Sequence, residues 1–105
     1  MVEERSWKEK LAHVNEARAR VHAELAAAHK ASEAARGAFW QRVRADALGD
    51  VPFDAEERKA AQREITGLTQ AWKDAVALCN FIERLVEEAE GRSSTELRQR
   101  LGLLG

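Results

Sequence analysis

The side chains best suited to metal chemistry in this sequence are His13, His22 and His29. His22 and His29 are seven positions apart, which is about 10.5 Å along a helix, too far for two ligands of one ion. The sequence contains no CxxC, HxxxH or HExxH spacing. We therefore expect surface histidines, and we predict neither a metal site nor a cofactor.

A second candidate for chemistry is the acidic run "ERLVEEAEG", in which Glu83, Glu87 and Glu90 recur at helical spacing. Paired carboxylates hold divalent metals in helical bundles when more than one helix supplies them. The first half of the chain has no matching pair on its apolar seam. A small helical metal-dependent hydrolase is therefore a second alternative, while the main expectation is a chain that is not an enzyme, with no catalytic residue and no small-molecule substrate.

Cys79 is the only cysteine. It allows no disulfide within one chain, which is typical of a reducing compartment. It falls on an apolar seam, and no cluster of positive residues surrounds it in the sequence. We therefore expect a buried, inert thiol.

Basic residues alternate with aromatic ones in "ARGAFWQRVR", where Arg36, Arg42 and Arg44 lie close to Trp40. Such a mixture of basic and aromatic residues is typical of protein surfaces that bind nucleic acid. Up to Arg44, basic residues outnumber acidic ones by 9 to 6, and in the remainder acidic residues outnumber basic ones by 12 to 8. In an antiparallel hairpin these two parts neutralise one another. Binding of nucleic acid through the three arginines is therefore an alternative function.

The composition indicates one helical domain over residues 1–105, since the chain has one Pro, six Gly and abundant Ala. The net charge is −1, which gives no general attraction to nucleic acid or a membrane. The charged start "MVEERSWKEK" lacks the apolar core of a signal peptide. We expect a cytoplasmic protein, and the excess of Arg over Lys suggests a bacterium or its phage.

Two long heptad patterns predict two long helices. The first, about 7–47, begins with a capping box of Ser6 and Glu9. The second, about 55–90, begins with a capping box of Asp54 and Glu57, and a turn is expected at 48–54. The apolar seam positions are Trp7, Leu11, Val14, Val21, Leu25, Ala28, Ala35 and Phe39 in the first helix, and Ile65, Leu68, Trp72, Ala75, Cys79, Ile82, Val86 and Ala89 in the second.

A short third helix is predicted at about 94–103. Gly91 is read as the stop of the second helix, and Ser93 with Glu96 as a third capping box. Leu97, Leu101 and Leu104 then share one face of this short helix.

The predicted fold class is all-α: a long antiparallel, coiled-coil-like helical hairpin with the third helix at its C-terminal side. With the turn near residue 51, facing positions sum to about 102, so Trp72 faces the level of residues 28–32 and Arg18 faces Glu83. The layout resembles small secreted helical hairpins of the WXG type. The Trp-x-Gly motif of that family is absent here, because Gln41 and Arg42 follow Trp40, so the resemblance implies the architecture only.

The stretch "DAVALCNFIERLVE" holds more apolar residues than one partner helix can cover. Leu78, Phe81 and Leu85 lie beside or outside the seam. We predict a protein interface made of these three residues, with Leu101 and Leu104 completing it and Trp40 contributing outside the seam. The partner is expected to be a second copy, giving a dimeric four-helix arrangement, or another protein. The predicted function is an adaptor, assembly factor or small inhibitor.

Overall fold

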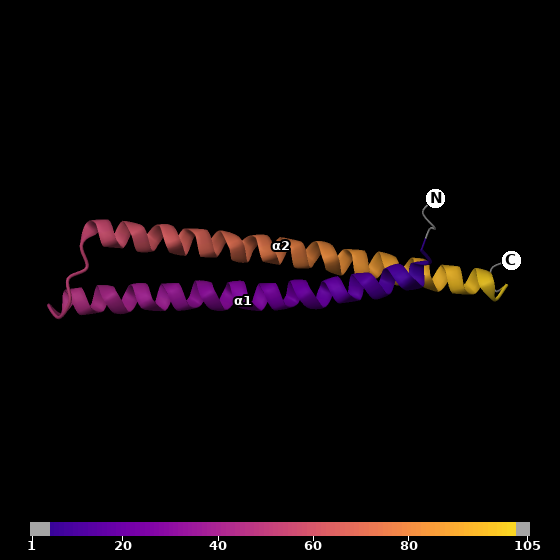
Figure 1. The fold of residues 1–105 in the computed structure, drawn as a ribbon, viewed down its shortest axis with the longest axis horizontal. Coiled ribbons are helices and arrows are strands. Elements are labelled where there is room, and N and C mark those ends of the chain that lie inside the picture. The colour runs from indigo at the N-terminus through magenta and orange to yellow at the C-terminus, as the bar shows by residue number, and fades with distance from the viewer. Residues whose placement is uncertain (1–4, 103–105) are drawn as a thin grey trace. The chain divides into compact units, whose positions relative to one another are not determined.

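The computed structural model describes residues 5–102 of the chain, and these residues form two long helices. Helix α1 spans Trp7–Ala47 and helix α2 spans Ala55–Arg100 (Figure 1). No strand occurs between residues 5 and 102. The all-α class and the two long helices predicted from the sequence are therefore confirmed.

The start of each helix is capped as the sequence predicts. The Ser6 hydroxyl accepts a hydrogen bond from the Glu9 amide at 3.3 Å, and the Asp54 carboxylate accepts one from the Glu57 amide at 2.8 Å. Each oxygen satisfies one of the amides that have no partner within the first turn of a helix.

The end of α1 is a Schellman motif centred on Gly49. The Gly49 amide donates to the Asp46 carbonyl at 3.0 Å and the Asp50 amide donates to the Ala45 carbonyl at 2.9 Å. This arrangement needs a residue in the left-handed region, and Gly49 has a φ of 78°. The motif turns the chain sharply out of α1 into the segment that leads to α2.

The prediction of a separate third helix is wrong, because α2 continues without interruption through Gly91 to Arg100. Gly91 does not take a positive φ, whereas Gly102 does, at 70°. The helix therefore ends at Arg100, about ten residues or nearly three turns later than expected. At this end the Gly102 amide donates to the Gln99 carbonyl at 3.1 Å. A glycine inside a helix costs only about 1 kcal/mol relative to alanine, which packing can offset. Leu104 lies outside the described residues.

The chain divides into two compact units. One contains the residues up to Ala23 and from Ala77 onward, and the other is Glu24–Val76. Within the first unit the segments of α1 and α2 are antiparallel, since Val21 contacts Cys79 and Arg18 contacts Glu83. Its buried residues are Val21, Cys79, Val86 and Ala89.

Within the unit Glu24–Val76 the two helical segments are also antiparallel. Arg36 contacts Thr69, and the rings of His29 and Trp72 lie 5.1 Å apart. The latter contact confirms the predicted level of Trp72. Phe53, in the turn, is buried and lies edge-on to Phe39 with ring centroids 5.6 Å apart. Every apolar seam residue predicted from the sequence, in both units, is buried or half-buried, so the seam is confirmed.

Candidate interaction surfaces

The first candidate surface is the α2 face of Leu78, Phe81 and Leu85, in the unit that contains the residues from Ala77 onward. Phe81 is 57% exposed and Leu78 is also exposed, while Leu85 is half-buried. Their spacing of three and four positions places them on one side of the helix. The structure therefore brings together these three of the predicted interface residues, and we call them the α2 face.

Leu101 does not complete the α2 face. It lies just beyond the end of α2, twenty positions after Phe81, which corresponds to about 30 Å along a helix. The expectation that a third helix folds back and brings Leu101 over Phe81 fails because α2 is continuous. Leu101 is 63% exposed, and Leu104 falls outside the described residues.

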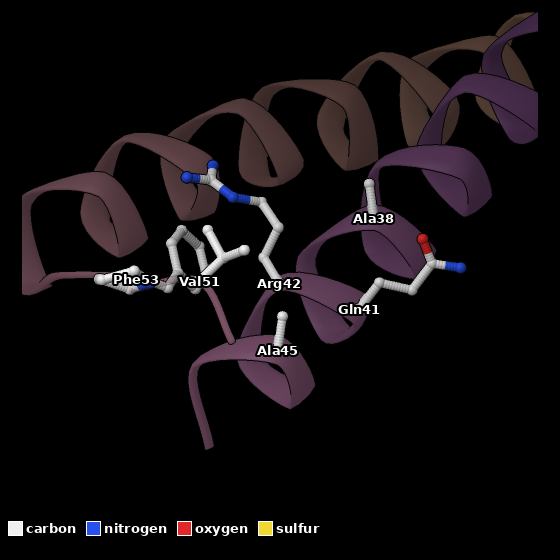
Figure 2. A pocket seen from close by; sticks show the side chains of 7 residues that line it. Ala38, Gln41, Arg42, Ala45, Val51 and Phe53 are labelled. Atoms are coloured by element: carbon white, nitrogen blue, oxygen red, sulfur yellow. The ribbon is translucent and has the colours of Figure 1, made fainter. Parts of the chain in front are cut away.

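The second candidate surface surrounds the turn. Trp40 is 64% exposed, and Leu48 and Val51 are exposed to a similar degree. Of these three residues, Val51 also lines an open pocket of about 280 Å³ (Figure 2). The pocket is lined by Ala38, Gln41, Arg42 and Ala45 of α1 and by Val51, Pro52 and Phe53 of the turn. We call it the turn pocket. The sequence analysis singled out Trp40 but missed the pocket, whose residues meet only through the reversal at Gly49.

Arg42 forms one wall of the turn pocket. Its guanidinium carbon lies 4.0 Å from the centroid of the Phe53 ring, and the guanidinium also forms an ion pair with Glu57 at the start of α2. A guanidinium over an aromatic face is attracted by the ring electrons. Both contacts hold the Arg42 side chain in place, and the ion pair balances its charge. Figure 2 shows the Arg42 side chain among the residues that line the pocket.

The three arginines predicted as nucleic-acid contacts do not share one face of α1. Arg36 donates to the Thr69 hydroxyl at 3.2 Å and lies 3.9 Å from the Glu33 carboxylate. Arg42 is held by Glu57 and Phe53. Arg44 is exposed and, two positions after Arg42, points about 200° away from it around the helix. Two of the three side chains are therefore already engaged within the chain, and nucleic-acid binding through them stays a prediction.

A polar cluster is formed by Arg18, His22 and Glu83. The Glu83 carboxylate lies 2.9 Å from His22 Nε2 and accepts a hydrogen bond from Arg18 at 2.7 Å. These two hydrogen bonds, that of His22 first, lower the pKa of the Glu83 carboxyl from its usual value. The Arg18–Glu83 pair confirms the predicted facing of these residues. All three side chains are more than a third exposed, so the cluster is a surface network.

The remaining candidates for chemistry are placed as follows. His13, His22 and His29 are exposed, as predicted. Within residues 5–102 no group of three or more His, Cys, Asp or Glu side chains is placed to hold a metal ion. Cys79 is buried, as predicted, and its thiol donates to the Val21 carbonyl at 3.4 Å.

A contact that the sequence analysis missed joins the start of α1 to the last turns of α2. The Trp7 amide donates to the Glu96 carboxylate at 3.0 Å. The Trp7 ring lies 4.4 Å from Lys10 Nζ and 4.8 Å from the Arg92 guanidinium carbon. Residues 7 and 96 sum to 103, so this contact keeps the register set by the turn. The sequence analysis missed it because it ended the second helix at about residue 90 and assigned Glu96 to a separate third helix.

Comparison of the chain with protein-family models, curated proteins and solved structures gives no match. In the part of the chain from residue 5 to residue 102, neither helix has a stretch long and apolar enough to cross a membrane.

Proposed function

We propose that this protein is an interaction module that has no catalytic activity and binds a protein partner through the α2 face. The observation that carries this proposal is Phe81, a large aromatic side chain that is 57% exposed next to the exposed Leu78 and the half-buried Leu85. Large apolar side chains gathered on one face of a helix are typical of surfaces that a partner covers.

The spacing of the α2 face suits a helical partner. Leu78, Phe81 and Leu85 repeat every three and four residues, which is the pattern that one helix presents to another. The chain itself supplies amphipathic helices, so a second copy is the proposed partner, and two hairpins joined in this way form a four-helix arrangement. The role of such a module is that of an adaptor, assembly factor or small inhibitor, and the single cysteine fits a cytoplasmic setting.

The test is the substitution Phe81→Asp, which places a charge in the middle of the proposed contact. We expect light scattering of dilute solutions to show a dimer for the wild-type chain and a monomer for the variant. Circular dichroism should show unchanged helix content, because Phe81 is largely exposed. The matched control is Asn80→Asp, which adds the same charge at an exposed neighbouring position about 100° around the helix.

Two results contradict the proposal. The first is a wild-type chain that stays monomeric at every concentration, which rules out self-association through this face. The second is a dimer that Phe81→Asp and Asn80→Asp leave equally intact, which shows that the chain associates elsewhere.

A further inference from the structure

We propose that the turn pocket is a second, independent interaction surface, and that its occupant is the C-terminal end of α2 from a second copy of this chain. The contact joins two different parts of the protein surface, Leu97 and Leu101 of one copy and the turn pocket of the next. It does not depend on the α2 face.

The turn pocket suits an aliphatic side chain. Most of its wall is apolar, from Ala38, Ala45, Val51 and Phe53, and Figure 2 shows Val51 standing beside the Phe53 ring. The charge of its one ionised residue, Arg42, is already balanced by Glu57. A volume of about 280 Å³ is at or below the lower end of the range typical for cofactors and drug-sized ligands. One or two leucine side chains are therefore a better match than a small-molecule ligand.

The end of α2 presents such side chains. Trp7, the first residue of α1, is hydrogen-bonded to Glu96, so the part of α2 after Glu96 extends beyond the start of α1. Leu97 and Leu101 in this extension are both more than half exposed. They are four positions apart and share one side of the helix. Together they form a small apolar patch, which we call the projection, and the turn pocket is large enough to accept its side chains.

The charges around the two surfaces are complementary. Asp46 lies in the last turn of α1 and Asp50 in the segment that follows this helix, whereas Arg98 lies between Leu97 and Leu101 in the sequence. None of these three residues takes part in an ion pair within the described part of the chain. Arg44 is also close in sequence but points away from the side of α1 that carries Arg42. A leucine of α2 that enters the turn pocket therefore brings the Arg98 guanidinium to the part of the chain that carries Asp46 and Asp50.

A contact between two different surfaces has a specific consequence for assembly. Each copy that is bound at its turn pocket still offers its own end of α2, so further copies can add to the assembly. The assembly should grow with protein concentration. It should also weaken with added salt, because the charges involved are exposed.

The test uses two variants in a background that already carries Phe81→Asp, so that association through the α2 face does not contribute. Val51→Asp places a charge at the mouth of the turn pocket, and Leu101→Asp places one on the projection. Both residues are exposed, and circular dichroism checks that helix content is retained. Sedimentation velocity of the background chain should show a monomer in dilute solution and masses that increase as the concentration is raised. Each variant alone should remain a monomer over the same concentration range.

The decisive sample is an equimolar mixture of the two variants. The Val51→Asp chain keeps an intact end of α2 and the Leu101→Asp chain keeps an intact turn pocket, so the mixture should form a complex of one copy of each and nothing larger. A matched control, Ala26→Asp at an exposed position of α1 away from both surfaces, should assemble like the background chain.

Three outcomes overturn the proposal. In the first, the background chain stays monomeric at its highest attainable concentration. In the second, the mixture is no heavier than its separate components. In the third, Val51→Asp prevents assembly but Leu101→Asp does not, which means that the turn pocket takes some other occupant.

Discussion

The carboxylate of Glu96 caps the first turn of α1, because it accepts a hydrogen bond from the Trp7 amide at 3.0 Å while Arg100 donates to its other oxygen at 3.1 Å. The cap therefore comes from the opposite helix and from a residue 89 positions away. It complements the local cap, in which the Ser6 hydroxyl accepts from the Glu9 amide.

Substitution of Glu96 by Ala should lower the free energy of unfolding by about 1 kcal/mol, the usual cost of losing a helix cap. Glu96→Gln should cost less, because the amide oxygen still accepts from Trp7 although it carries no charge. Urea unfolding of the full chain measures both. Glu90→Gln, at an exposed position on the same helix, is the control, and a loss there as large as that of Glu96→Ala contradicts the interpretation.

Glu83 should make the stability of the chain depend on pH in the acid range. Its pKa is lowered in the folded chain by His22 and Arg18, so folding favours the ionised carboxylate. The stabilisation is fully present above the usual carboxyl pKa and is lost as the pH falls through the lowered pKa of the folded chain. Wild type and Glu83→Gln should therefore differ in urea midpoint near neutral pH and converge in acid. A difference that stays constant over this range contradicts the prediction.

Substitution of Gly91 and of Gly49 by alanine should change the free energy of unfolding in opposite directions. At Gly91 a Cβ atom has no neighbour within 4 Å and the backbone is helical, so Gly91→Ala should raise the free energy of unfolding by up to about 1 kcal/mol. At Gly49 the φ of 78° disfavours any side chain, so Gly49→Ala should lower it by about 1 kcal/mol or more. Thermal unfolding measures both. Destabilisation by Gly91→Ala implies a break in α2 at that point.

Ser32→Ala should stabilise the chain. Ser32 is 1% exposed, and its hydroxyl has no hydrogen-bond partner among the described residues. A buried hydroxyl without a partner costs about 1–3 kcal/mol, and alanine is also the better helix former. The gain expected in urea unfolding is about 1 kcal/mol, because removal of the oxygen leaves a small gap. A loss of stability instead shows that the hydroxyl is bonded in solution.

The pairing of the two helices could be predicted from the sequence. The heptad period shows which residues face the partner helix, and the position of the turn shows which residues lie at the same level. The heptad pattern identifies the residues that the structure buries, and the turn near residue 51 places Arg18 opposite Glu83. That pair is found at 2.7 Å. The register needs only the position of the turn, since each residue beyond it advances both helices by the same 1.5 Å.

The continuation of α2 beyond residue 90 could not be predicted in this way. The glycine and the capping residues at 91–96 are compatible both with a new helix and with a continuous one. Glu96 was read as part of a capping box with Ser93, but its carboxylate caps α1 instead. Thr95 donates to the Gly91 carbonyl at 3.0 Å, a bond that the continuous helix accommodates. Gly91 stops a helix only if the chain gains more from turning than from continuing, and that depends on the packing of Trp7 and Arg92, which no local pattern contains.

The turn pocket was not foreseen for a related reason. Phe53 and Arg42 come from opposite sides of the turn, and their contact at 4.0 Å depends on the left-handed backbone at Gly49. The sequence marks a turn at this point but does not give the direction in which the following residues leave it.

The distances in sequence between contacting residues impose an order on folding. In the unit Glu24–Val76 they are shorter, from 11 positions for Arg42 and Phe53 to 43 for His29 and Trp72. The other unit joins Val21 to Cys79 over 58 positions and Trp7 to Glu96 over 89. Closing a short loop loses less chain entropy, and contacts local in sequence form faster. Folding should therefore begin at the turn, and the contacts between α1 and α2 should form progressively away from it. The contact between Trp7 and Glu96 should form last. During ribosomal synthesis the start of α1, at Trp7, must therefore wait without its partner until the residues around Glu96 emerge.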